Sequence, residues 1–234
     1  MYNLPQRLFA EFIGTFTLIF IGAGSICADR YLSTTGQSGI GVLGIAVAHG
    51  LAIAIMVTAI GHISGGHFNP AITLGFWVTK RLGTVKSVFY WVSQLFGATA
   101  AAYLLSVIVP ESIWRPVALG TPDLAADFTR WHGMLLEGLT TFLLVFVVFA
   151  TAVDAKGAFN KIAGFAIGLT ITMDILLGGP LTGAAMNPAR AFGPALVAHH
   201  WTNHGVYWVG PLLGGILAAV IYDRAFLRDQ PPAA

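Results

Sequence analysis

The triplet Asn-Pro-Ala occurs twice in this chain, at Asn69-Pro70-Ala71 and at Asn187-Pro188-Ala189. Asparagine is a strong helix N-cap and proline is favoured at the first helical position, so each copy predicts the start of a helix. The side chain of an asparagine also carries N–H groups that can donate hydrogen bonds. Each triplet therefore combines a helix N-terminus with an amide donor at one point of the chain.

The two helices that begin at these triplets are predicted to be short, from residue 70 to about 80 and from residue 188 to about 199. At about 1.5 Å per residue, each reaches about 15 Å, half of a hydrocarbon core of about 30 Å. Two such half-helices entering from opposite faces would meet N-terminus to N-terminus, where their dipoles repel cations. Non-helical backbone at that depth must be buried in protein or line a watery cavity, so the triplets should line a pore.

The composition indicates an integral membrane protein: of 234 residues, 56% are hydrophobic and 9% are charged, and the mean hydropathy is +0.76. The net charge of +2 is scattered over loops, which argues against nucleic-acid binding. The single cysteine, Cys27, excludes a disulfide within the chain and a cysteine metal cluster. No enzyme motif and no cofactor or metal site is expected.

Six apolar runs are long enough to span a bilayer, at residues 8–27, 42–60, 85–109, 133–153, 162–177 and 206–226. Glu11 lies inside the first run, and a carboxylate there argues for a retained helix instead of a cleaved signal peptide. Lysines and arginines concentrate on the side of the two chain ends, which predicts that both termini are cytoplasmic. The plasma membrane is the expected location.

The chain repeats itself in two halves, approximately residues 1–110 and 130–234. Glu11 matches Glu137, and residues 48–53 match residues 166–171 at the spacing that separates the two asparagines. Each half holds three spans and one half-helix, and because three is odd the halves must insert with opposite topology. The predicted fold is a single all-α channel domain over residues 1–234, with six transmembrane helices and two half-helices.

The segments 61–71 and 183–193, together with the paired intramembrane glutamates, resemble the aquaporin (major intrinsic protein) family over essentially the whole chain. The resemblance implies a passive water channel that excludes protons and ions, with one pore per chain in a homotetramer. Water, small neutral solutes and the lipid bilayer are the expected partners. Asn69 and Asn187 would each donate to a passing water, and a water held by two donors interrupts a proton-conducting file.

The same resemblance places Arg190 in a constriction near the extracellular mouth, together with His49, Ile175 and Ala184. Strict water channels carry an aromatic residue, a histidine and often a cysteine at the other three places, so this ring should be wider and less polar. The combination is similar to tonoplast intrinsic proteins and their ammonia-permeable relatives. We expect water permeation with some ammonia. Members of that branch sometimes carry an additional histidine in the long extracellular loop, where the nearest position in this chain is Pro122. His132 is close by and is the alternative, with a solvated loop histidine as the simpler interpretation.

Glu11 and Glu137 are predicted to be buried carboxylates that accept hydrogen bonds from the half-helix loops, with a proton relay as the alternative. The family resemblance places His67 near the cytoplasmic pore lining. Asp174 must find a donor or face the pore. The cluster of His199, His200 and His204 near the outer mouth is interpreted as solvated, with a surface zinc site as the alternative.

Several alternatives remain open at this stage. A closed or structural member of the same fold would share every motif, and so would a facilitator of urea, hydrogen peroxide or glycerol. Glycerol is disfavoured because Ala191 and Ala195 stand where that branch carries acidic and basic residues. A coupled secondary transporter would need a titratable or ion-coordinating centre at the midplane, where this chain has asparagine.

Overall fold

The computed structural model describes residues 2–157 and 162–227, which form helices and loops with no strand among them. Six helices are long and apolar enough to cross a membrane. They are α1 (Leu4–Thr34), α2 (Gly41–Ser64), α4 (Thr84–Ile108), α6 (Arg130–Val148), α7 (Ala163–Thr182) and α9 (Val206–Tyr222). The predicted all-α membrane fold is confirmed.

The remaining helices are short. The two half-helices are α3 (Pro70–Val78) and α8 (Pro188–Ala198), and the loop after α4 holds α5 (Glu111–Trp114) and the turn η1 (Arg115–Gly120). The turns η2 (Phe149–Val153) and η4 (Asp223–Leu227) extend α6 and α9.

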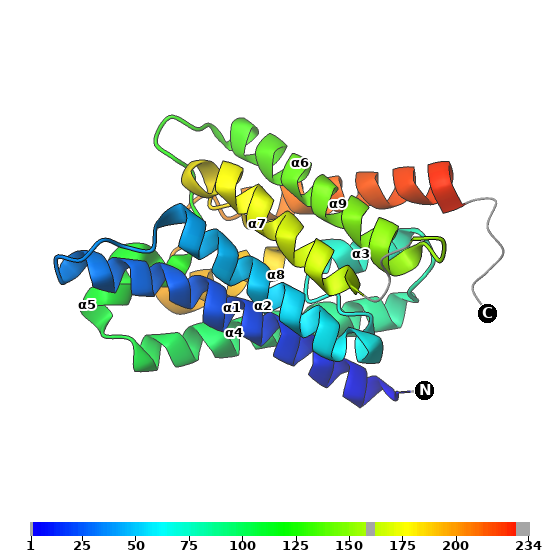
Figure 1. The fold of residues 1–234 in the computed structure, drawn as a ribbon, viewed down its shortest axis with the longest axis horizontal. Helices are drawn as coiled ribbons and strands as arrows, with labels where there is room; N and C mark the ends of the chain where they lie inside the picture. Colours follow the sequence, from blue (N-terminus) through cyan, green and yellow to red (C-terminus); the bar gives the residue numbers. More distant parts are fainter. Residues whose placement is uncertain (1, 158–161, 228–234) are drawn as a thin grey trace.

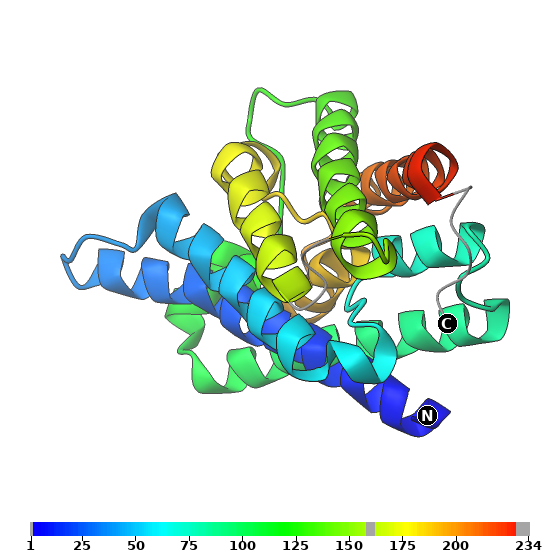
Figure 2. The same ribbon diagram turned by 45° about the vertical axis from the view of Figure 1, so that its right-hand side comes forward.

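The six long helices run side by side and enclose the two half-helices (Figure 1). The helix α2 packs on α7, α6 packs on α9, and α1 packs on both α2 and α4. The half-helix α8 lies against α4, and α3 lies against α9, as the turned view shows (Figure 2). The start of α1 and the end of α9 lie at the same end of the bundle (Figure 1), as an even number of spans requires.

The surface of the bundle is apolar and part of its interior is polar. Leucine, isoleucine and methionine side chains such as Leu43, Ile55, Met173 and Leu213 are exposed on the long helices. Glutamate, glutamine and arginine side chains are buried inside the bundle. This distribution suits a protein whose outer solvent is lipid.

The first helix is longer than the apolar run that predicts it. It begins at Leu4 because the Asn3 side chain accepts a hydrogen bond from Gln6 N–H while the Gln6 side chain accepts one from Asn3 N–H. It continues to Thr34, past the charged residues Asp29 and Arg30. Polar residues beyond the hydrocarbon core can stay helical, and hydropathy alone does not detect them.

The helix α7 also exceeds its predicted end at residue 177. It continues through Gly178, Gly179 and Pro180 to Thr182. Gly183, at φ 82°, closes it in the left-handed conformation, and its N–H donates to the Gly179 carbonyl. This extension brings Thr182 to the second pore loop.

Candidate pore

Each half-helix begins at its asparagine. Asn69 has an extended backbone and its Oδ1 accepts from Ala71 N–H at 2.8 Å. Asn187 is also extended, and its Oδ1 accepts from Ala189 N–H at 3.0 Å and from Arg190 N–H at 3.3 Å. These caps leave the amide Nδ2 of each asparagine free to point away from its own helix.

The two half-helix loops are joined to each other through these amides. Asn69 Nδ2 donates to the Met186 carbonyl at 2.8 Å, and Asn187 Nδ2 donates to the Phe68 carbonyl at 2.9 Å. Each amide group has two hydrogens, so one is used between the loops and one remains available to another acceptor. Sequence reasoning assigned both amides to the pore and missed this reciprocal bond.

Glu11 holds the first pore loop from inside α1. It is fully buried, and its Oε1 accepts from the Ser64 hydroxyl at 2.6 Å and from His67 N–H at 3.0 Å. Its Oε2 accepts from Phe68 N–H and from Gln94 Nε2, both at 2.7 Å. A carboxylate with four donors is well satisfied in an apolar interior.

Glu137 on α6 holds the second pore loop in the same way. Its Oε1 accepts from the Thr182 hydroxyl at 2.7 Å and from Ala185 N–H at 3.0 Å, and its Oε2 accepts from Met186 N–H at 2.8 Å. The side chain is fully buried. Both glutamates therefore bind backbone N–H groups of loops that have no secondary structure to satisfy them.

Two tyrosines complete the support of the loops. The Tyr90 hydroxyl donates to the Ser64 carbonyl, and the Tyr207 hydroxyl donates to the Thr182 carbonyl, each at 2.8 Å. Sequence reasoning missed both. The spacing between them almost equals that between the two asparagines, and this internal match is the signal that could have found them.

The four residues of the predicted constriction surround one passage. His49, Ile175, Ala184 and Arg190 all line the narrow channel, and three of them also border a vestibule of about 260 Å³ above it. Arg190 is 2% exposed, and its Nη1 donates to the Gly120 carbonyl at 2.7 Å. His49 Nδ1 donates to the Ile45 carbonyl at 2.9 Å, which assigns the ring hydrogen to Nδ1 when the ring is neutral.

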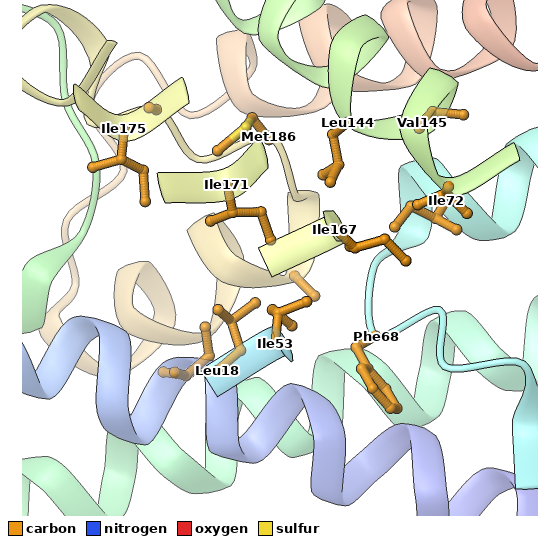
Figure 3. Packing of buried hydrophobic residues seen from close by; sticks show 14 of the residues in the cluster. Leu18, Ile53, Phe68, Ile72, Leu144, Val145, Ile167, Ile171, Ile175 and Met186 are labelled. Atoms are coloured by element: carbon orange, nitrogen blue, oxygen red, sulfur yellow. The ribbon is translucent and has the colours of Figure 1, made fainter. Parts of the chain in front are cut away.

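The channel below the constriction is narrow and has apolar side chains on facing walls. Ile175, Ile171 and Ile167 follow one another along α7 and face Leu18 and Ile53 across the open space (Figure 3). The narrow channel has a volume of about 20 Å³. Since one water needs about 10–15 Å³, this space holds one or two waters.

His67 lines the channel beneath Asn69. Its Nδ1 lies 3.0 Å from the Thr73 hydroxyl, and its ring packs against Phe76 and Tyr90. Asp174 is buried on α7 and is not among the residues that line the channel or the vestibule.

The outer histidines do not converge. His199 ends α8, at φ 54°, and His200 Nε2 lies 2.9 Å from Asp123 Oδ2. His204 Nε2 accepts from Trp208 Nε1 at 3.0 Å, and burial lowers the pKa of His204. Within residues 2–157 and 162–227, no group of three potential ligands is placed to hold a metal ion.

At the loop position where ammonia-permeable relatives carry a histidine, this chain has Pro122. Pro122 borders the vestibule. His132 is exposed and belongs to the capping box at the start of α6: its N–H donates to the Thr129 hydroxyl, and its Nδ1 accepts from Thr129 N–H.

Asp123 ties the vestibule loop to the segment that follows α8. Its Oδ1 accepts from Asn203 Nδ2 at 2.9 Å and from Leu124 N–H at 2.8 Å, and His200 contacts its other oxygen. Burial acts to raise the pKa of Asp123, but the hydrogen bonds from Asn203, His200 and Leu124 outweigh it and hold that pKa below its usual range. No sequence pattern predicts this tether, because His200 and Asn203 are far from Asp123 in the chain.

Acidification should weaken this tether. A carboxyl with a lowered folded-state pKa stabilises the fold above its unfolded value of about 3.9 and loses that contribution as the pH falls through the folded value. We expect thermal stability to fall more steeply below about pH 4 in the wild type than in Asp123→Asn. Unfolding temperatures measured between about pH 3 and pH 7 check this, and parallel pH profiles would contradict it.

Two half-helices that meet beneath a constriction inside six membrane spans define a channel-type fold, and comparisons with known proteins identify the family. The major intrinsic protein family matches residues 2–222. "Probable aquaporin TIP3-2" of Arabidopsis thaliana is 44% identical over 232 residues, covering 95% of this chain and 85% of the relative. "Aquaporin TIP4-4" of Zea mays is 44% identical over 226 residues, covering 96% of this chain and 88% of the relative.

A solved structure agrees in fold. The X-ray structure of the aquaglyceroporin from Plasmodium falciparum has a TM-score of 0.82 and 22% sequence identity, and it covers 96% of this chain and 98% of its own. The chain therefore belongs to the major intrinsic protein family, a family of membrane channels and not of enzymes.

Proposed function

We propose that this protein is a passive water channel. The observation that carries the proposal is the meeting of Asn69 and Asn187, each capping a half-helix and bonded to the opposite loop, beside a channel of about 20 Å³. Each asparagine keeps one N–H for a water in single file. A water that accepts from both cannot also accept from its neighbours, so the file conducts water and not protons.

Ion exclusion follows from the charges along the path. The positive ends of α3 and α8 face each other at the asparagines, and the guanidinium of Arg190 lies at the constriction above them. A cation entering this path meets positive charge twice and finds no carboxylate among the lining residues of the narrow channel.

Ammonia is proposed as a second permeant. Ile175 and Ala184 contribute apolar side chains to the constriction that His49 and Arg190 also line. A neutral solute loses less hydration than an ion when it enters such a ring. The ring also does not select only for the hydrogen-bond pattern of water. Urea and hydrogen peroxide are the further candidates of the same size class, with glycerol the least favoured.

The test of selectivity uses the double variant His49→Phe, Ile175→His in proteoliposomes. We expect it to keep water flux, measured by stopped-flow shrinkage, and to lose most of its ammonia flux, measured by internal pH, because it narrows the ring and restores polarity. Wild-type protein that passes water but no ammonia would limit the proposal to water. Equal ammonia flux in both proteins would show that the ring does not set selectivity.

A closed or structural role is the alternative, and the narrowness of the channel is the observation that favours it. Absence of any flux above empty liposomes would support this alternative. For assembly we propose a homotetramer with one pore in each chain, its exposed apolar helix faces meeting lipid or a neighbouring copy.

The protein is a multi-pass membrane protein. We propose that both termini face the cytoplasm, since the charge bias predicts it and the start of α1 and the end of α9 share one end of the bundle (Figure 1). The plasma membrane is the proposed location, and an internal membrane, which the similarity to TIP aquaporins favours, is the alternative. We also propose that the channel domain is a duplication, because Glu11, Ser64 and Tyr90 are matched by Glu137, Thr182 and Tyr207 in their hydrogen bonds.

A further inference from the structure

An apolar groove runs along the outside of the contact between α6 and α9, which pack side by side in the bundle (Figure 2). It has a volume of about 250 Å³, and all of its lining residues are apolar or glycine. Leu135 and Leu139 on α6 and Leu213 and Leu217 on α9 line it, and each of them is more than half exposed. In a membrane, such a groove must be filled by hydrocarbon or by another protein surface.

The groove is about as long as one leaflet is thick. On α6 its lining extends from Trp131 to Phe142, and at 1.5 Å per residue this is about 16 Å. Half of a hydrocarbon core of about 30 Å is about 15 Å. Trp131 lies at the start of α6, at the end of the bundle opposite the start of α1 (Figure 1). The groove therefore lies in the leaflet away from that end, with room for an acyl chain.

A second hollow, of about 380 Å³, adjoins the outer end of the groove, because Met134 and Val209 line both spaces. This hollow is partly polar, since Arg130, Asn203 and His204 line it. A polar space at the membrane border that continues into an apolar groove matches the two parts of a lipid, a headgroup and a chain.

Arg130 supplies a positive charge to the hollow. Its Nε donates to Asn203 Oδ1 at 3.1 Å, which orients the guanidinium. Its two Nη groups make no hydrogen bond or ion pair with the residues that the structure describes. His204 Nε2 accepts from Trp208 Nε1, so a neutral ring carries its hydrogen on Nδ1 and can donate from there. Arginine is the residue best suited to bind a phosphate group through two N–H groups.

We propose that the hollow and the groove bind one anionic phospholipid, with its phosphate on Arg130 and one acyl chain between α6 and α9. Trp131 lines the groove and Trp201 lines the hollow, and they are 67% and 44% exposed, as is common for tryptophan at a membrane–water interface. A helix of a second copy would fill the groove with apolar side chains and leave the charge of Arg130 unpaired. A phospholipid supplies both the hydrocarbon and the anion.

Native mass spectrometry of the detergent-solubilised protein tests the headgroup site without measuring flux. The probes are phosphatidylglycerol and phosphatidylcholine with the same acyl chains, at equal concentration. We expect the wild type to retain one phosphatidylglycerol per chain and to prefer it about fivefold, since choline would bring a second cation to Arg130. Arg130→Gln should lose this preference. Arg30→Gln is the matched control, because it removes an exposed arginine near the outer end of α1, and it should keep the preference.

The acyl-chain site is tested by Val209→Trp, where the two spaces join. Val107→Trp is the matched control, because Val107 is 65% exposed near the outer end of α4 and lines neither space. We expect Val209→Trp to lose bound phospholipid and Val107→Trp to bind like the wild type. If Val209→Trp does not fold, the comparison of Arg130→Gln with Arg30→Gln decides alone.

Other occupants would give different results, and each would overturn the proposal. A lipid preference that responds equally to Arg130→Gln and Arg30→Gln would show that Arg130 does not hold the phosphate. Displacement of the lipid by an equal concentration of glycerol 3-phosphate would assign the hollow to a free phosphate. A changed oligomer mass in Val209→Trp with unchanged lipid binding would assign the groove to a second copy of the chain.

Discussion

Glu11→Leu should abolish water flux and remove most of the folded protein. The substitution takes away the acceptor of four buried donors, of which His67 N–H and Phe68 N–H belong to the pore loop and cannot turn toward another partner. A buried donor left without a partner costs about 1–3 kcal/mol, so these two backbone groups alone put the loss at about 2–6 kcal/mol. That loss is a large part of a whole domain stability of about 5–15 kcal/mol.

Thermal unfolding in detergent and flux in proteoliposomes measure this effect. Glu111→Leu is the matched control, because Glu111 is exposed and its ion pair with Arg115 is of the surface type that contributes about 0–1 kcal/mol. We expect this control to unfold and conduct like the wild type. If Glu11→Leu unfolds at the temperature of the control, the first pore loop does not depend on Glu11.

Gly193→Ala should produce the second large effect, through the position of a half-helix. A Cβ at Gly193 would lie 2.5 Å from the carbonyl carbon and oxygen of Ala98 on α4. These are backbone atoms that cannot rotate away, so α8 must shift, and overpacking of this kind costs about 1–3 kcal/mol. Since Asn187 and Arg190 lie at the start of α8, we expect flux to fall about tenfold together with the unfolding temperature.

The same substitution at Gly205 is the control. Gly205 precedes α9, and a Cβ there would have no other atom within 4 Å. Gly205→Ala should therefore keep the wild-type flux. Normal flux and stability in Gly193→Ala would mean that α8 does not need its close approach to α4.

Much of the fold was predictable because membranes restrict structure to a few solutions. Apolar run length identified all six spans, and the N-cap and proline signals identified both half-helices. The ends were less accurate. Capping by Asn3 extends α1, and the left-handed Gly183 ends α7 five residues beyond its apolar run. These are local backbone effects that hydropathy does not measure.

The site residues that recur in both halves of the chain were predictable from the sequence. Those brought together only by helix packing were not. The asparagines and the glutamates occur as pairs in the sequence, and the structure places each pair at matched positions. Gln94 has no matching residue in the other half of the repeat. The tether from Asp123 to Asn203 has no matching pair there either. Contacts between residues so distant in the chain depend on helix packing, which the pattern of one sequence does not specify.

The most direct measurement is osmotic water flux in proteoliposomes containing wild type, Ile175→Trp and Met173→Trp. Ile175 lines the constriction, whereas Met173 is exposed on the outside of the same helix, so the two variants differ in location and not in chemistry. We expect Met173→Trp to conduct like the wild type and Ile175→Trp to fall to the level of empty liposomes. Undiminished flux through folded Ile175→Trp would contradict a pore that passes between His49, Ile175, Ala184 and Arg190.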